Sequence, residues 1–230
     1  MIRWIRLSAS AVVILFFGLN YPWSHAALAR LIAPVDCNND LVENAREAVG
    51  RFFGGMEASP HYLCLDRPTL GLVVSHGSAR FAPLMSTIIV LGPQGQNPDV
   101  AAHEAAHAEL VERTSVLLRT FRLPTWFDEG LAMQLDGRAP YTAKALSAYL
   151  ADTDLDPPSL DAIDAPSKFF RPGRQGRLHY AFAKCIVGGW LRANGSNALT
   201  MLMANTGWHQ PFPIEDFRQH EDRCQAGASK

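Results

Sequence analysis

Residues 97–113 read Asn-Pro-Asp-Val-Ala-Ala-His-Glu-Ala-Ala-His-Ala-Glu-Leu-Val-Glu-Arg. Asn97 is a preferred N-cap, Pro98 suits the first turn of a helix, and no helix breaker follows, so these residues predict one helix. Its two histidines are four residues apart, one turn from each other on the same face, where both imidazoles can reach one ion. Glu104 lies about 100° round the helix from His103, which places it beside such an ion rather than on it.

This helix has two interpretations. In the first, His103 and His107 bind a divalent metal ion, and Glu104 accepts a proton from a water held there. Imidazole ligands in this number suit zinc, which lowers the pKa of water toward neutrality. In the second, the segment is an alanine-rich core helix whose histidines hydrogen-bond to neighbouring groups.

A second stretch favours the metal site. Residues 124–132 read Pro-Thr-Trp-Phe-Asp-Glu-Gly-Leu-Ala and predict a helix that starts near Pro124 or Thr125 and ends at residues 136–137. A catalytic zinc ion needs three protein ligands and an open position. A turn over 114–123 would bring Glu129 back to the two histidines as the third ligand, and Gly130 would let the backbones approach closely.

The two stretches together resemble the gluzincin metallopeptidases and, within them, the bacterial peptidase MA-like group. That pattern is His-Glu-x-x-His followed by a Pro-x-Trp-x-x-Glu-Gly-Leu-Ala helix whose glutamate is the third zinc ligand. The resemblance extends, more weakly, over about 89–198. It implies a zincin-like α+β fold and a zinc-dependent peptidase that hydrolyses peptide bonds in peptide or protein substrates.

The resemblance also implies roles for single residues. His103, His107 and Glu129 would be the ligands of one Zn²⁺ ion, and Glu104 would be the general base. In related aminopeptidases a tyrosine from a downstream helix stabilises the oxyanion; Tyr180 is its nearest match here, with His179 as the alternative. The chain departs from the family pattern at Glu109, where a hydrophobic residue is usual, so Glu109 is a candidate hydrogen-bond partner of the metal site.

The same family pattern suggests where a substrate binds. In such folds the strand before the metal-binding helix borders the cleft, which makes 86–91 the expected edge strand, able to pair with an extended peptide. The alternative is a plain buried strand. Arg171, Arg174 and Arg177 cluster before Tyr180, either as solvated loop charge or as a lid that meets a substrate carboxylate.

The first 29 residues have the three parts of a secretory signal peptide. A basic start over 1–6 is followed by an uncharged apolar run over 7–19 and by the small-x-small sequence Ala27-Leu28-Ala29. The alternative is an uncleaved membrane anchor, because Tyr21-Pro22-Trp23 extends the segment with interfacial residues. We therefore expect a periplasmic or extracellular protein, anchored in the inner membrane if the signal is not cleaved.

Four cysteines follow, and none forms a Cys-x-x-Cys pair, which argues against a zinc ribbon or a thioredoxin-type site. An even number in an exported chain favours two disulfides. Of the three connectivities we favour Cys37–Cys64 and Cys185–Cys224, because each closes a loop within one half of the chain. The alternative is four buried free thiols.

The remaining patterns predict an α+β fold. A helix over 38–53 and strands over 70–74 and 86–91 precede the two metal-site helices, and the chain from 141 onward is helical or looped, with a long helix over 178–191. Residues 30–230 are expected to form one peptidase MA-like domain, with a small mixed lobe over about 30–136 and a mostly helical lobe over 137–230.

Composition limits the classes of function. The chain has 21 basic and 22 acidic side chains and a net charge of −1, which leaves no electrostatic footprint for nucleic acid. Two alternatives to the peptidase remain: an inactive zinc-binding protein of the cell envelope, and a metal-free structural protein of the envelope. Oligomeric state and the choice between endopeptidase and exopeptidase stay open.

Overall fold

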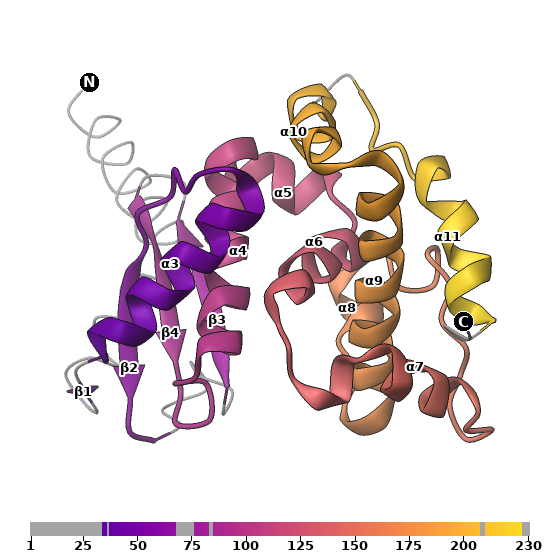
Figure 1. Ribbon diagram of the computed structural model, residues 1–230, viewed down its shortest axis with the longest axis horizontal. Helices are drawn as coiled ribbons and strands as arrows, with labels where there is room; N and C mark the ends of the chain where they lie inside the picture. Colours follow the sequence, from indigo (N-terminus) through magenta and orange to yellow (C-terminus); the bar gives the residue numbers. More distant parts are fainter. Residues whose placement is uncertain (1–33, 36, 68–75, 83–84, 208–209, 227–230) are drawn as a thin grey trace, which may run out of the picture.

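A computed structural model describes residues 34–35, 37–67, 76–82, 85–207 and 210–226. Figure 1 shows a sheet with α3 and α4 beside it, followed by a group of helices arranged around α9. This order of a small mixed sheet and then helices confirms the predicted α+β class. The expected signal peptide or anchor and the expected strand over 70–74 lie outside the described residues.

The N-terminal part contains both strands and helices: β1 (Pro34–Val35), α3 (Asn39–Phe53), β2 (His61–Leu65), β3 (Gly77–Ala82), β4 (Met85–Leu91) and α4 (Pro98–Thr114). The rest of the described chain is helical: α5 (Val116–Arg122), α6 (Thr125–Ala132), η1 (Met133–Leu135), η2 (Ala139–Tyr141), α7 (Ala143–Leu150), α8 (Pro166–Phe169), α9 (Gly173–Asn194), α10 (Ser196–Asn205) and α11 (Glu215–Gln225). Among these helices, none combines the length and apolar character that a membrane span requires.

Local signals set the ends of α3 and α4 as predicted. The Asn38 side chain accepts a hydrogen bond from the backbone N–H of Asp40, and Gly54 ends α3 with a φ of 77°. The Asn97 side chain caps α4 by accepting from the Val100 N–H at 3.1 Å. The cap at Asn97 is the predicted one, and Asn38 caps the helix that was expected over 38–53.

The sheet has the strand order β1-β2-β4-β3, with β2 and β4 parallel and the other pairs antiparallel. The expectation that 86–91 forms the edge of the sheet is wrong, because β3 pairs along the outer side of β4. Ile89 and Leu91 of β4 are fully buried. The described edge next to α4 is therefore β3.

The turn expected over 114–123 contains a short helix, α5, which Figure 1 shows between α4 and α6. Ser115 separates α4 from α5 with a φ of 102°, and its hydroxyl accepts a hydrogen bond from the Leu118 N–H. None of the α5 residues is buried. The helix therefore has no apolar face toward the core, and the hydrophobic pattern could not reveal it.

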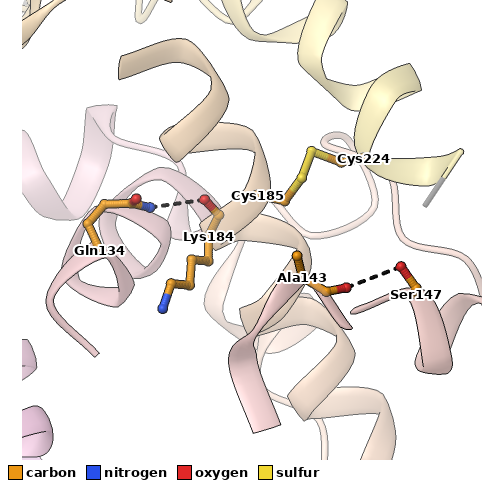
Figure 2. The surroundings of a disulfide bond; sticks show 6 residues. All are labelled: Gln134, Ala143, Ser147, Lys184, Cys185 and Cys224. Atoms are coloured by element: carbon orange, nitrogen blue, oxygen red, sulfur yellow. Dashed lines mark hydrogen bonds between the residues drawn. A yellow bond between two sulfur atoms is a disulfide. The ribbon is translucent and has the colours of Figure 1, made fainter. Parts of the chain in front are cut away.

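Two disulfides, Cys37–Cys64 and Cys185–Cys224, have the favoured connectivity. They indicate an oxidising compartment outside the cytoplasm. Figure 2 shows how the second one holds α9 on one side, by joining it to α11, while the Lys184 carbonyl accepts a hydrogen bond from the Gln134 side chain of η1 on the other. The long helix that carries Tyr180 is thereby fixed from both directions.

Candidate metal centre

Three buried side chains from α4 and α6 converge on one point. His103 Nε2 and His107 Nε2 lie 3.2 Å apart, and Glu129 Oε2 lies 3.4 Å from the first and 3.5 Å from the second. Each of the three residues is less than 8% exposed. These three side chains form a group that could hold a metal ion. The histidines lie on one face of α4 because of their spacing, while α6 brings the carboxylate to them.

Close packing of α6 against α9 sets the position of Glu129. A Cβ atom on Gly130 would lie 2.6 Å from the carbonyl oxygen of Ala183 in α9, so only glycine allows this approach. Gly130 therefore permits a close contact as expected, but the contact is with α9. The neighbouring rings of Trp126 and Phe127 are fully buried against Phe217 of α11, at centroid distances of 5.2 and 5.6 Å.

A second carboxylate supports the site from behind. Asp128 Oδ1 lies 2.7 Å from His107 Nδ1, and the other Asp128 oxygen pairs with the guanidinium of Arg119 from α5. That guanidinium also stacks over the Phe81 ring of β3, 4.4 Å from its centroid. A carboxylate on the second ring nitrogen orients an imidazole ligand and raises its basicity. The chain of contacts runs from His107 through α6 and α5 to the edge strand.

These charges shift the protonation equilibria of the site. Burial by itself lowers the pKa of His107, but the Asp128 and Glu129 carboxylates outweigh burial and raise that pKa to about 10. Burial by itself raises the pKa of Glu129, and the two imidazoles more than offset it, so this pKa lies well below its ordinary value. Without a metal ion, an imidazolium therefore occupies the space between two carboxylates.

Glu104 lies next to the three converging side chains, against the edge strand. Its Oε2 atom accepts a hydrogen bond of 2.6 Å from the backbone N–H of Ala79 in β3. A Cβ atom on Gly77 would lie 3.0 Å from Glu104 Cγ and 3.1 Å from its Oε1. Gly77 thus leaves room for the carboxylate, and the Ala79 amide holds it in one orientation.

Tyr180 of α9 faces the same site. Its ring centroid is 6.4 Å from that of His103 and 5.8 Å from that of Tyr141. Burial and then the charges of Glu129 and Glu104 raise the pKa of Tyr180 well above 10. The phenol therefore keeps its proton at physiological pH and can donate a hydrogen bond.

Two other candidates from the sequence have structural partners. His179 Nδ1 lies 2.7 Å from the Phe169 carbonyl oxygen, and its Nε2 lies 2.8 Å from the Gln175 amide nitrogen, so both ring nitrogens are engaged. Glu109 accepts hydrogen bonds from the N–H groups of Glu57 and Ala58 and from Arg113. The suggestion that Glu109 supports the metal site is wrong, because its carboxylate fixes the link between α3 and β2.

Four residues that support the site were not predicted from the sequence: Asp128, Arg119, Gly77 and Ala79. Asp128 directly precedes Glu129, and the adjacency of two acids on a helix that carries a metal ligand was the available signal. Ala79 acts through its backbone, which no side-chain pattern marks.

Comparison with protein-family models, with curated proteins and with solved structures found no match for this chain. The molecule itself shows a buried His-His-Glu group able to hold a metal ion, in a fold with two disulfides.

Proposed function

We propose that this protein is a zinc-dependent peptidase of gluzincin type that acts outside the cytoplasm. The observation that carries the proposal is the spacing of the three converging ligand atoms. Zinc binds nitrogen and oxygen ligands at about 2.0–2.2 Å, so two ligands of a tetrahedral zinc ion lie about 3.3–3.6 Å apart. The pairwise distances of 3.2, 3.4 and 3.5 Å among His103, His107 and Glu129 fit that geometry.

The number and chemistry of the ligands also favour a catalytic ion. Structural zinc sites are usually closed by four protein ligands, whereas catalytic sites have three and an open position. Two imidazoles and one carboxylate are the ligand set of known zinc peptidases. The cysteines of the chain are joined in disulfides, so none is free to form a closed thiolate site.

The residues around the ion would then divide the work of peptide hydrolysis. Bound zinc would polarise the scissile carbonyl and lower the pKa of water. Glu104, held by the Ala79 amide, would take the proton of the attacking water and pass it to the leaving amine. Tyr180, protonated and facing the site, would donate a hydrogen bond to the developing oxyanion.

Metal content and peptide cleavage, measured on matched variants, test the proposal. Wild type is expected to bind a single zinc ion and to cleave members of a peptide library. Glu104→Gln is expected to keep its zinc and to lose about 10²–10⁴-fold in kcat/KM, because only the general base is removed. The control is Glu112→Gln, at an exposed position of the same helix, which should behave as wild type.

The other outcomes would contradict the proposed mechanism or favour another class of protein. Full activity of Glu104→Gln would remove the proposed mechanism. Zinc without cleavage in wild type would favour an inactive zinc-binding protein of the envelope. Protein that is purified without added zinc, carries no metal and takes up none would favour a structural protein.

A further inference from the structure

We propose that a pocket between α5 and α8 binds a bulky apolar side chain of the substrate, next to the bond that is cleaved. The inference rests on the proposed peptidase function and specifies its substrate class. The pocket has a volume of about 430 Å³, in the range of sites that bind small molecules and side chains. Its apolar walls include Phe121, Leu123, Pro166 and Phe170.

The pocket adjoins the metal centre. Asp128 and Glu129 both line it, so the residue that supplies the third ligand atom also forms part of the pocket wall. On the other side, the Phe170 ring lies 6.4 Å from the Tyr180 ring, which lies 6.4 Å from the ring of His103. A peptide whose scissile carbonyl lies between Tyr180 and the metal ligands would therefore have a neighbouring side chain at this pocket.

The pocket has exposed aromatic walls that nothing else in the described chain covers. Phe121 is 66% exposed and Phe170 is 50% exposed. They are two of the four large hydrophobic residues that are exposed in the described ranges; the others are Leu117 and Met201. Exposed apolar groups gathered at a concave site favour a ligand, because covering them removes apolar area from water.

Each charged side chain that lines the pocket already has an interaction within the chain. Arg119 pairs with Asp128 and stacks on Phe81, and Arg122 also has an interaction of its own. Asp164 accepts from Lys168 at 2.9 Å, and its carbonyl accepts from the Thr125 N–H. An acidic or basic substrate side chain would have to compete with these pairs, whereas an apolar one needs only the aromatic walls. The pocket chemistry thus favours phenylalanine, tryptophan or leucine.

The test compares peptides that differ at single positions beside the cleavage site. Wild type is expected to prefer Phe over Ala at one such position by about tenfold or more in kcat/KM, as expected for filling an apolar pocket. The double variant Phe121→Ala/Phe170→Ala should lose most of that preference. Leu117→Ala is the matched control, because Leu117 lies exposed on the same helix without lining the pocket, and it should keep the preference.

Binding of the same peptides to Glu104→Gln, followed by fluorescence, is a second measurement that does not need turnover. If this variant binds Phe peptides through the two aromatic walls but wild type cleaves none, the pocket stands and the proposed catalysis fails. If wild type cleaves peptides and the preference survives in the double variant, the pocket proposal fails alone. A preference for Asp or Glu at the position would also overturn it. Circular dichroism and zinc content confirm that each variant folds.

Discussion

The two sides of the Glu129 carboxylate are built in opposite ways. Toward α4 it faces buried imidazoles, and behind these Asp128 and Arg119 pair in a chain of charges that reaches the edge strand. Toward α5 and α8 it faces a pocket that Asp128 and Arg119 also line and whose outer rim carries two exposed aromatic residues, Phe121 and Phe170. The buried side holds its groups in fixed positions before any ligand arrives, whereas the exposed side leaves apolar surface for a ligand to cover.

In the proposed peptidase, catalysis and substrate selectivity would therefore have separate physical requirements. A buried charge is costly unless it is paired, so every charged group on the metal side needs a partner. The rings of Phe121 and Phe170, which form the rim of the pocket, face water and need no polar partner. They therefore contribute little to folding. Substitutions on the metal side should therefore affect metal binding strongly, and those on the rim should affect only recognition.

The largest effect is expected from removal of the carboxylate itself. Glu129→Ala should lower zinc affinity by more than the roughly 100-fold that the loss of an outer partner can cause, because a direct ligand disappears. Competition with a chromophoric chelator measures this. Glu112→Ala, exposed on α4, is the control and should bind zinc as wild type does. Equal affinity in the two variants would show that the ligand set is wrong.

The next effect concerns the support behind His107. Asp128→Asn keeps an acceptor for the Nδ1–H group but removes the negative charge, and it should lower zinc affinity by about 10- to 100-fold. Asp152→Asn is a matched control, because Asp152 also pairs with an arginine, Arg174, away from the site. A similar loss in both variants would mean that the effect is a general cost of breaking an ion pair.

Zinc binding by the buried histidines should depend on pH. Because the pKa of His107 is raised to about 10, the metal-free site holds a proton that zinc must displace. Zinc affinity should therefore rise about tenfold per pH unit between pH 6.5 and 8.5. Glu129 stays ionised over this range and adds no slope, since its pKa lies below its ordinary value. Chelator competition at each pH measures the slope.

The same linkage has the opposite sign for the metal-free protein. The stability that protonated His107 contributes is complete below its unfolded pKa of about 6.5 and is lost as pH rises through about 10. Metal-free protein should thus become less stable as pH rises above 6.5, whereas the zinc-loaded form, in which His107 carries no proton, should gain no pH dependence from this group. A flat zinc affinity over the range would contradict the charge arrangement, and Asp128→Asn should reduce the slope.

The smallest effect is expected at the rim. Phe121→Ala and Phe170→Ala should each change the free energy of unfolding by no more than about 0.5 kcal/mol, because both rings are at least half exposed. Denaturant titration measures this, with Leu117→Ala as the reference for an exposed residue of α5. A cost above about 1 kcal/mol would show that the rings are part of a packed core and not a free wall.

Much of the fold follows from local patterns. The helix expected over 38–53, the cap at Asn97 and the strand at β4 lie where the sequence indicates them, since capping and turn residues act within a few positions. The short helix α5 escaped prediction because it buries no residue. The edge position of β3 escaped because strand order depends on pairing between distant segments.

Helical spacing alone places His103 and His107 on one face of a helix with Glu104 beside them, because this spacing is a local property of the chain. Glu129 was expected as the third ligand, and the structure brings it to both imidazoles through packing that the sequence does not show, the contact of Gly130 with α9. Tertiary packing also brings the Asp128 carboxylate to the His107 ring and the rings of Phe121 and Phe170 to the pocket that Glu129 lines. These arrangements depend on how separate elements pack, and no spacing along the chain records that packing.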